Sequence, residues 1–212
     1  YANEFYPDVD DTAAVGLALH RADPERYRPV LERTARGIIG MQSRSGGWGA
    51  FDADNTHYFL NAIPFADHGA LLDPPTADVT ARCVSFLAQI GTPPSHPSIA
   101  RGVAFLESEQ EKDGSWFGRW GVNSIYGTWS VLAALNAAGV AQDAPSVRRA
   151  VAWLKSQQRS DGGWGEDGAS YKLDYKGYEK APSTASQTAW ALLALMAAGE
   201  VDHPAVAHGI AY

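Results

Sequence analysis

The stretch Gln158-Arg-Ser-Asp-Gly-Gly-Trp164 has two near copies earlier in the chain, Gln42-Ser-Arg-Ser-Gly-Gly-Trp48 and Gln110-Glu-Lys-Asp-Gly-Ser-Trp116. Each copy places Gly four residues after Gln, and Trp two residues after that Gly. A motif that recurs in this way marks a repeat protein, in which one small structural unit packs against the next. We therefore predict that the three Trp residues are structural and pack the turn of each repeat against a helix end.

One type of helix in this repeat begins with Pro, at Pro97-Ser-Ile, Pro145-Ser-Val and Pro204-Ala-Val. Pro suits a first helical turn because the N–H that it lacks has no partner there. These helices carry Arg, Lys and Glu on one face, which indicates that they lie on the outside. The last of them is not followed by a Gln and Trp of its own, so we expect the chain to be cut inside a repeat and truncated at both ends.

A second type of helix begins at Thr and carries almost no charge. Four Thr residues open such apolar runs, and the last three runs reach a helix-stopping Gly eleven residues later: Thr12, Thr80, Thr128 and Thr188, with Gly91, Gly139 and Gly199. Helices that are apolar on most sides are buried. The alternation predicts an all-α fold, an α/α barrel or toroid of repeated helix pairs with the apolar helices around its axis. We expect a single domain over residues 1–212 that forms an incomplete barrel.

An acidic run, Asp8-Val-Asp-Asp-Thr-Ala13, precedes the first apolar helix. Three carboxylates this close cannot all ionise at little cost, so at least one should keep its proton above the usual pH. These residues alone leave two interpretations open. The run is a solvated helix cap, a position that Asp favours, or it holds a general acid in a dry site.

The repeat also predicts which side chains accompany this run. The position two residues before each repeat Thr holds Asp10, Asp78, Tyr126 and Ser186. If the repeats superpose, these four lie at the N-terminal ends of successive inner helices and ring one end of the same cavity. Within the apolar runs, Trp129 and Trp190 are predicted to be core residues. Residues 165–181 are polar and are predicted to form an exposed loop, with Tyr171, Tyr175 and Tyr178.

The composition excludes several classes of function. The chain has 212 residues, 45% of them apolar and 19% charged, which is enough material for a sizeable core. A net charge of -7 without a basic stripe argues against binding to nucleic acid. The single cysteine, Cys83, excludes a disulfide framework and a cysteine-based zinc site within one chain. The histidines show no metal-binding spacing, and the longest apolar run, Ala189–Ala198, is too short to cross a bilayer.

Taken together, these motifs resemble the squalene–hopene cyclase family of triterpene cyclases. The resemblance rests on the three Gln-Trp elements, on Asp8-Val-Asp-Asp-Thr-Ala13 and on Gly114-Ser-Trp-Phe-Gly-Arg-Trp-Gly-Val-Asn123, and it covers essentially the whole chain. Members of this family are much longer, so the chain resembles their C-terminal part. The resemblance implies that this part alone is inactive.

The resemblance implies a role for each matching acid. Asp10 matches the proton donor of the family, Asp8 and Asp11 match the flanking acids that tune it, and Asp78 matches a second acid nearby. Arg82 stands where the best-known members have His next to the donor. Its apolar helix context predicts a buried acidic partner, because a buried cation needs one.

The resemblance also implies a set of aromatic side chains that bind the substrate. Trp120 and Tyr126 match aromatic residues that line the cavity of the family, and Phe51 stands where the best-known members have Tyr. The implied reaction is cyclisation of squalene to a pentacyclic triterpene, hopene or hopanol. It starts by protonation of a terminal alkene and proceeds through carbocations, which aromatic faces stabilise by roughly 0.5 to 2 kcal/mol per contact. Neither a cofactor nor a metal is implied.

Partners follow from the same resemblance. It implies a squalene-like hydrophobic substrate. It also implies peripheral (monotopic) attachment of the full-length protein to the cytoplasmic side of the cell membrane, and it is compatible with a homodimer.

Two other functions fit parts of the sequence. An α/α-toroid glycosidase would also use paired carboxylates and aromatic residues, but a sugar site needs many polar partners, and the inner runs are nearly hydrocarbon. An inactive helical-repeat fragment is the non-catalytic alternative, because half a barrel exposes apolar faces. A prenyltransferase-like toroid would need a zinc site, for which Cys83 has no neighbouring ligands.

Overall fold

The computed structural model describes residues 8–63, 72–171 and 177–212 of the chain. Its long helices alternate between two layers. The inner layer contains α1 (Val9–Ala22), α3 (Ala77–Gln89), α5 (Ser124–Ala137) and α7 (Ala185–Ala197), and the outer layer contains α2 (Pro24–Gly40), α4 (Pro97–Ser108), α6 (Pro145–Gln157) and α8 (Pro204–Ala211). Among the residues that the structure describes, two short 3-10 helices, η1 (Tyr58–Ala62) and η3 (Gly168–Tyr171), lie in the connections.

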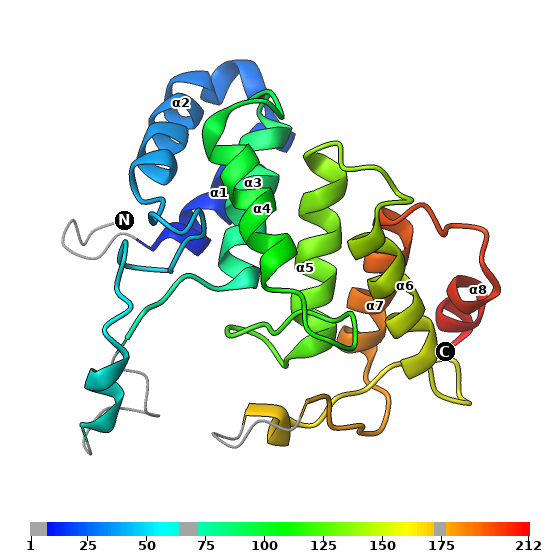
Figure 1. Ribbon diagram of the computed structural model, residues 1–212. Coiled ribbons are helices and arrows are strands. Elements are labelled where there is room, and N and C mark those ends of the chain that lie inside the picture. Colours follow the sequence, from blue (N-terminus) through cyan, green and yellow to red (C-terminus); the bar gives the residue numbers. More distant parts are fainter. Residues whose placement is uncertain (1–7, 64–71, 172–176) are drawn as a thin grey trace.

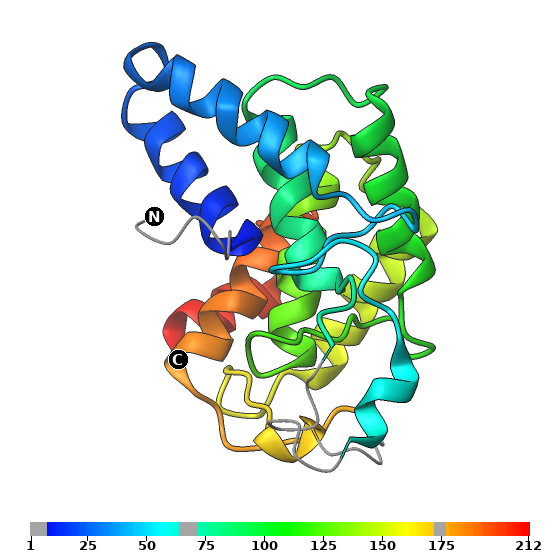
Figure 2. The same ribbon diagram turned by 90° about the vertical axis from the view of Figure 1, so that its left-hand side faces the viewer.

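The inner helices pack side by side in chain order, α1 on α3, α3 on α5 and α5 on α7, and each outer helix packs on the inner helix that precedes it (Figure 1). Turning the molecule by 90° shows α1 and α7 on one side and α4 and α6 on the other (Figure 2). This arrangement confirms the predicted all-α architecture of repeated helix pairs. The connections that lead into α3, α5 and α7 gather along the lower edge of Figure 1, at the N-terminal ends of the inner helices.

The ends of the helices follow the predicted signals in most places. Pro occupies the first turn of α4, α6 and α8, and the Gly after each of α3, α5 and α7 has a positive φ, of 98°, 77° and 83°. The inner helices begin three or four residues before the repeat Thr rather than at it. Thr therefore lies within the first turn, where its hydroxyl is available to the preceding connection.

The Trp of each Gln-Trp turn joins two helices, the preceding outer helix and the following inner helix. The indole N–H of each Trp donates to a carbonyl in the last turn of the preceding outer helix, and its backbone N–H donates to the Thr hydroxyl of the following inner helix. The indole bonds run from Trp48 to Ile38, from Trp116 to Leu106 and from Trp164 to Leu154, at 2.7, 2.6 and 2.8 Å. The backbone bonds reach Thr80, Thr128 and Thr188, at 2.9, 3.0 and 3.0 Å. All three Trp side chains are fully buried, which confirms their structural role.

The Gln of each turn joins its repeat to the next one. Its side-chain amide donates to the Gly carbonyl in its own turn and to a carbonyl in the first turn of the next outer helix, as in Gln158 to Gly162 and Ala205, both at 2.8 Å. The Gly at the turn is obligatory for two reasons. Its φ is positive, and a Cβ on Gly162 would lie 2.5 Å from the carbonyl oxygen of His208.

Replacement of Gln158 by Ala tests this joint. The change removes two hydrogen bonds and leaves the carbonyl of Gly162 without that donor, so the free energy of unfolding should fall by about 1–3 kcal/mol. Gln157→Ala is the matched control, because the side chain of Gln157 donates only to the hydroxyl of Ser156. Thermal and denaturant unfolding measure both variants, and an equal loss in the two would contradict the assignment.

Candidate active site

The acidic run begins α1 and serves as its cap. Asp8 is the N-cap residue, and its carboxylate accepts a hydrogen bond of 3.0 Å from the backbone N–H of Asp11. The backbone N–H of Val9 donates to the carbonyl of Ala50 at 2.7 Å, which ties the start of α1 to the first Gln-Trp connection. Asp11 is exposed in the first turn. The cap interpretation is therefore correct for Asp8, and it leaves Asp10 for another role.

Asp10 forms an ion pair with Arg82 of α3. The Arg82 Nε lies 2.6 Å from Oδ1 of Asp10, and the two side chains are only 24% and 22% exposed. A second nitrogen of the same guanidinium, Nη2, donates to the hydroxyl of Tyr126 on α5 at 2.8 Å. One arginine of α3 thus links the first turns of the two inner helices on either side of it, α1 and α5. The predicted acidic partner of Arg82 is confirmed.

The pKa of Asp10 is raised above its ordinary value. Burial is the largest cause, Arg82 opposes it, and the charges of Asp78 and Asp8 add to the upward shift. A carboxyl in the acidic run thus holds its proton more tightly than usual, as predicted, although burial contributes more than the neighbouring acids. Because Arg82 occupies Oδ1, the oxygen that can carry the proton is Oδ2.

Asp78 supports the same region from α3. It is 1% exposed, and its two oxygens accept from the Thr76 hydroxyl at 2.6 Å and from the backbone N–H of Trp120 at 2.8 Å. The structure therefore brings Asp10, Asp78 and Tyr126 together, as the repeat predicted. Ser186, the fourth member of the expected ring, is exposed, and its hydroxyl lies 3.5 Å from that of Thr184.

Two groups of aromatic side chains flank the acids. Phe51 meets Trp120 edge to face, with ring centroids 6.0 Å apart, and Trp120 remains 49% exposed. Tyr126 meets Trp129 and Trp190 at 5.7 and 5.1 Å, and these two Trp rings are nearly parallel at 6.1 Å. The prediction that Trp129 and Trp190 are core residues is wrong in part, since both are only partly buried. They pack against the core and extend the aromatic surface of Tyr126.

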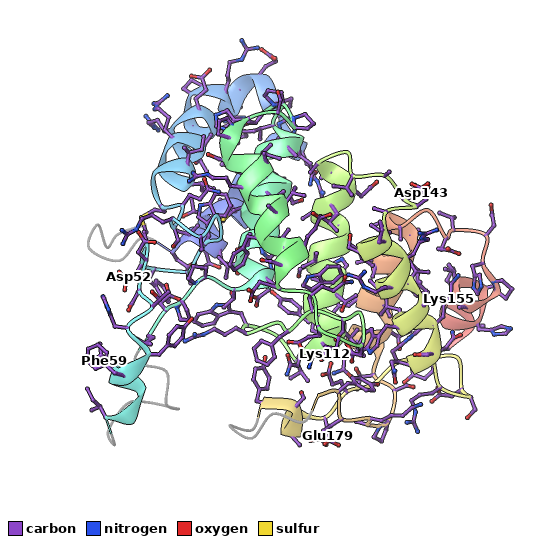
Figure 3. The ribbon with its side chains drawn as sticks, viewed as in Figure 1. Asp52, Phe59, Lys112, Asp143, Lys155 and Glu179 are labelled. Carbon is purple, nitrogen blue, oxygen red and sulfur yellow. The ribbon has the colours of Figure 1, made fainter. Side chains whose placement is uncertain are left out.

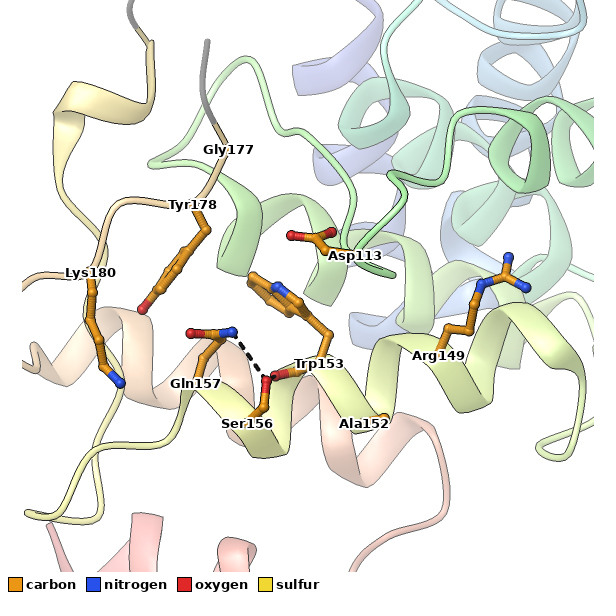
Figure 4. A pocket seen from close by; sticks show the side chains of 9 residues that line it. All are labelled: Asp113, Arg149, Ala152, Trp153, Ser156, Gln157, Gly177, Tyr178 and Lys180. Atoms are coloured by element: carbon orange, nitrogen blue, oxygen red, sulfur yellow. Dashed lines mark hydrogen bonds between the residues drawn. The ribbon is translucent and has the colours of Figure 1, made fainter.

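A groove of about 700 Å³ runs along the inner helices and includes Arg82 in its wall. Polar side chains also line it, namely Arg21, Ser85, Gln89, Ser130 and Asn136. A second hollow of about 800 Å³ lies against α6, where Trp153 and Tyr178 face each other between Arg149, Asp113 and Lys180 (Figure 4). None of the residues discussed around Asp10 lines this second hollow, so the candidate site is the acid and aromatic cluster at the N-terminal ends of α1, α3 and α5.

Sequence reasoning missed two buried carboxylates that shape the connections beside this cluster. Asp73 accepts from the backbone N–H groups of Ala50, Phe51 and Asp52, and so fixes the segment that carries the Phe51 ring. Glu166 accepts from three N–H groups at the start of α5. The sequence did not reveal either carboxylate as a structural residue, because both lie in loops. The prediction that residues 165–181 form an exposed loop is therefore wrong at Glu166 and Ser170, which are 5% and 1% exposed; Tyr175 lies outside the described residues.

Within the described ranges, no three His, Cys, Asp or Glu side chains are grouped as metal ligands would be. The site consists instead of the half-buried carboxyl of Asp10, the buried carboxyl of Asp78, a guanidinium, a phenol and several rings. A carboxyl with a raised pKa can act as a general acid when a nearby cation stabilises the carboxylate that remains after proton transfer.

Comparison with known proteins gives the family. The model of the squalene-hopene cyclase C-terminal domain matches residues 1–212. The chain belongs to this family. The squalene–hopene cyclase of Bradyrhizobium diazoefficiens is 62% identical over the whole chain, and that of Alicyclobacillus acidocaldarius is 52% identical. A squalene-hopene cyclase of the fungus Schizosaccharomyces japonicus is 60% identical.

The chain spans about a third of the length of these cyclases, between 32% and 34%. Among solved structures, an ent-copalyl diphosphate synthase from Streptomyces platensis superposes with a TM-score of 0.65 at 24% identity, over 97% of this chain and 35% of that one. This likeness supports the α/α-barrel fold. Membership of the cyclase family also favours the cyclase hypothesis over the glycosidase.

Replacement of Arg82 by Gln tests the electrostatic coupling at this candidate site. Arg82 lowers the pKa of Asp10, so its loss should raise that pKa further and keep the acid protonated to higher pH. Titration of ¹³C-labelled Asp carboxyls by NMR, with the Asp10 signal assigned from Asp10→Asn, measures the shift.

Arg21→Gln is the control for this titration. Arg21 lines the same groove and donates to Gln89 at 3.1 Å, but it is not among the charges that shift Asp10. An unchanged or lowered Asp10 pKa in Arg82→Gln would overturn the coupling.

Proposed function

We propose that this chain supplies the proton donor and part of the aromatic lining of an enzyme that cyclises squalene to a pentacyclic triterpene. The observation that carries the proposal is the Asp10 carboxyl, which has a raised pKa and contacts Arg82. Arg82 also donates to the hydroxyl of Tyr126, whose ring meets those of Trp129 and Trp190. The family membership supports the same reaction, because its named relatives are squalene–hopene cyclases.

Protonation of an alkene needs a strong acid that is un-ionised until it reacts. Burial raises the pKa of Asp10 and so favours retention of its proton before the reaction. Once the proton has left, the new carboxylate is stabilised by Arg82 and by the N-terminal end of α1, where Asp10 occupies the first turn. The same two groups therefore favour the products of proton transfer more than the reactants, which is the requirement for catalysis of this step.

The rings beside the acid suit the carbocations that follow. Aromatic faces attract positive charge, but they are not bases that would remove a proton and end the cascade early. Trp120 is held by its backbone bond to Asp78 while its side chain stays accessible, so it can face a substrate. The Tyr126 phenol remains neutral, because burial raises its pKa even though Arg82 acts in the opposite direction.

Activity and substrate uptake are properties of full-length cyclases, and this chain spans about a third of the length of such a relative. We propose that the acid site needs the remaining part of the barrel for closure, and that the protein associates peripherally with the cytoplasmic side of a membrane, where a hydrocarbon such as squalene is dissolved. Among the described residues there is no helix with the length and hydropathy to span a bilayer. The homodimer stays a prediction.

Asp10→Asn in the full-length protein should abolish most of the product formed from squalene. Removal of a general acid costs roughly 10²- to 10⁴-fold in rate. The matched control is Asp143→Asn, because Asp143 is exposed and lies on the loop before α6, across the molecule from Asp52 and the first connection (Figure 3). Gas chromatography with mass spectrometry measures the products. If Asp10→Asn formed as much cyclised product as the wild type, the assignment of Asp10 as proton donor would be wrong.

Trp120 gives a graded test of the aromatic lining. Trp120→Phe keeps an aromatic face and should retain most activity, whereas Trp120→Leu loses it and should release incompletely cyclised products. A cation–π contact of about 0.5–2 kcal/mol corresponds to a loss of about 2- to 30-fold in the rate of full cyclisation. The ratio of complete to incomplete products is the measurement, and equal ratios in the two variants would contradict a role in cation stabilisation.

A further inference from the structure

The helix that carries Tyr126 is capped by a residue from a later repeat. Asn123 is the N-cap residue of α5, but its side chain makes no capping bond. The carboxylate of Glu166 caps the helix instead, and accepts from the backbone N–H groups of Asn123, Ser124 and Ile125 at 3.1, 2.9 and 3.0 Å. Three of the N–H groups that a helix leaves unpaired at its start are therefore satisfied by one buried anion, which the helix dipole also favours.

Glu166 is itself held in place by α7. Its backbone N–H donates to Oε1 of Gln187 at 3.0 Å, and its carbonyl accepts from Nε2 of Gln187 at the same distance. Gln187 lies in the first turn of α7 and is 6% exposed. The contact runs through both sides of one amide, so the next inner helix sets the position of Glu166 together with the bridge that Glu166 forms with Lys180 of its own connection.

The same segment holds the loop that carries Trp120. Oδ1 of Asn123 accepts from the Gly118 N–H at 3.2 Å, while its Nδ2 donates to the carbonyl and hydroxyl of Ser170 at 3.1 and 3.0 Å. The Tyr171 hydroxyl reaches the loop carbonyls on either side of Trp120, those of Gly118, Arg119 and Gly121. Residues 166–171 therefore fix both the loop and the start of the helix.

A short chain of contacts connects this cap to the acid. Ile125 is the last N–H bound by Glu166, and Tyr126 is the next residue. Tyr126 accepts from Arg82, and Arg82 contacts Asp10. If the first turn of α5 frays, the Tyr126 hydroxyl moves, and the Arg82 guanidinium loses the contact that orients its Nε toward Asp10.

We propose that Glu166 is a positioning residue for the acid site: by fixing the first turn of α5 and the adjoining loop, it sets the places of Tyr126, Arg82 and Trp120. This inference rests on the proposed function. Glu166 does not reach the reacting atoms, so its loss should reduce the rate of the chemical step and the accuracy of cyclisation while leaving substrate binding largely intact.

Glu166→Ala and Glu166→Gln in the full-length protein test the proposal. Ala removes all three acceptor contacts, and Gln keeps the shape and one acceptor oxygen but loses the charge. Misplacement of reacting groups by about 1 Å costs on the order of 10²-fold, so kcat should fall roughly 10- to 100-fold in Glu166→Ala, with KM little changed and with more incompletely cyclised product. Glu166→Gln should fall between Glu166→Ala and the wild type.

Gln158→Ala is the control for a merely structural role. It weakens the Gln-Trp turn of the same connection, eight residues before Glu166, without touching α5. It should lower the melting temperature while kcat and product pattern at a permissive temperature stay close to wild type. If Gln158→Ala and Glu166→Ala lower kcat in proportion to their loss of stability alone, the positioning role is overturned.

Hydrogen–deuterium exchange without substrate separates this proposal from the proposed function. Exchange at residues 118–126 should accelerate in Glu166→Ala and remain slow in Gln158→Ala. If the wild type forms no cyclised product, the proposed function fails, yet faster exchange in this segment still supports the positioning role. Unchanged exchange at residues 118–126 in Glu166→Ala overturns it, whatever the enzyme makes.

Discussion

The structure depends on how each Gln-Trp turn satisfies the N–H groups of a buried Trp. A fully buried indole must find an acceptor, because an unpaired buried donor costs about 1–3 kcal/mol. The acceptor is always a carbonyl in the last turn of the outer helix, and the backbone N–H of the same Trp always takes the Thr hydroxyl of the next inner helix. Since both donors belong to one residue, the distance between an outer helix end and the following inner helix start is fixed in every repeat.

This constraint explains why an active site can be assembled from separate repeats. The Thr contact is present at α3, α5 and α7 and sets the rotation of these inner helices about their own axes. The position two residues before the repeat Thr lies at the same end of the layer in successive helices. Asp10, Asp78 and Tyr126 occupy that position, and the side chain of Arg82 joins the first to the third. The buried carboxylates Asp73 and Glu166 then fix the connections, which the Gln-Trp turns leave free to vary in length.

The sequence was sufficient to predict features that recur and insufficient for features that occur once. Gln158, Trp164 and Thr188 belong to a pattern seen three times, so their structural role and the alternation of helices could be inferred. Asp10 and Arg82 were paired by resemblance and by the cost of a buried cation. Glu166 belongs to no repeated pattern, and its partners at Asn123 lie more than forty residues away, so its role required the tertiary structure. Trp129 and Trp190 were misplaced for a related reason, since an apolar run does not reveal which side of an inner helix meets the next helix.

The pair of Asp10 and Arg82 shows how opposing effects produce an acid suited to one task. Burial alone would keep the proton on Asp10 but would make the carboxylate left after transfer costly. A fully charged ion pair alone would stabilise the carboxylate but would release the proton before any substrate arrived. In the structure, burial outweighs Arg82 and the pKa of Asp10 is raised, while the guanidinium stays within 2.6 Å of the carboxyl.

The arginine is in turn held by a neutral phenol rather than by a second carboxylate, so its charge is not cancelled before the proton leaves. Tyr126 therefore contributes to the acid strength of Asp10 through geometry more than through charge, and the support that Glu166 gives to the first turn of α5 bears on the acid for the same reason.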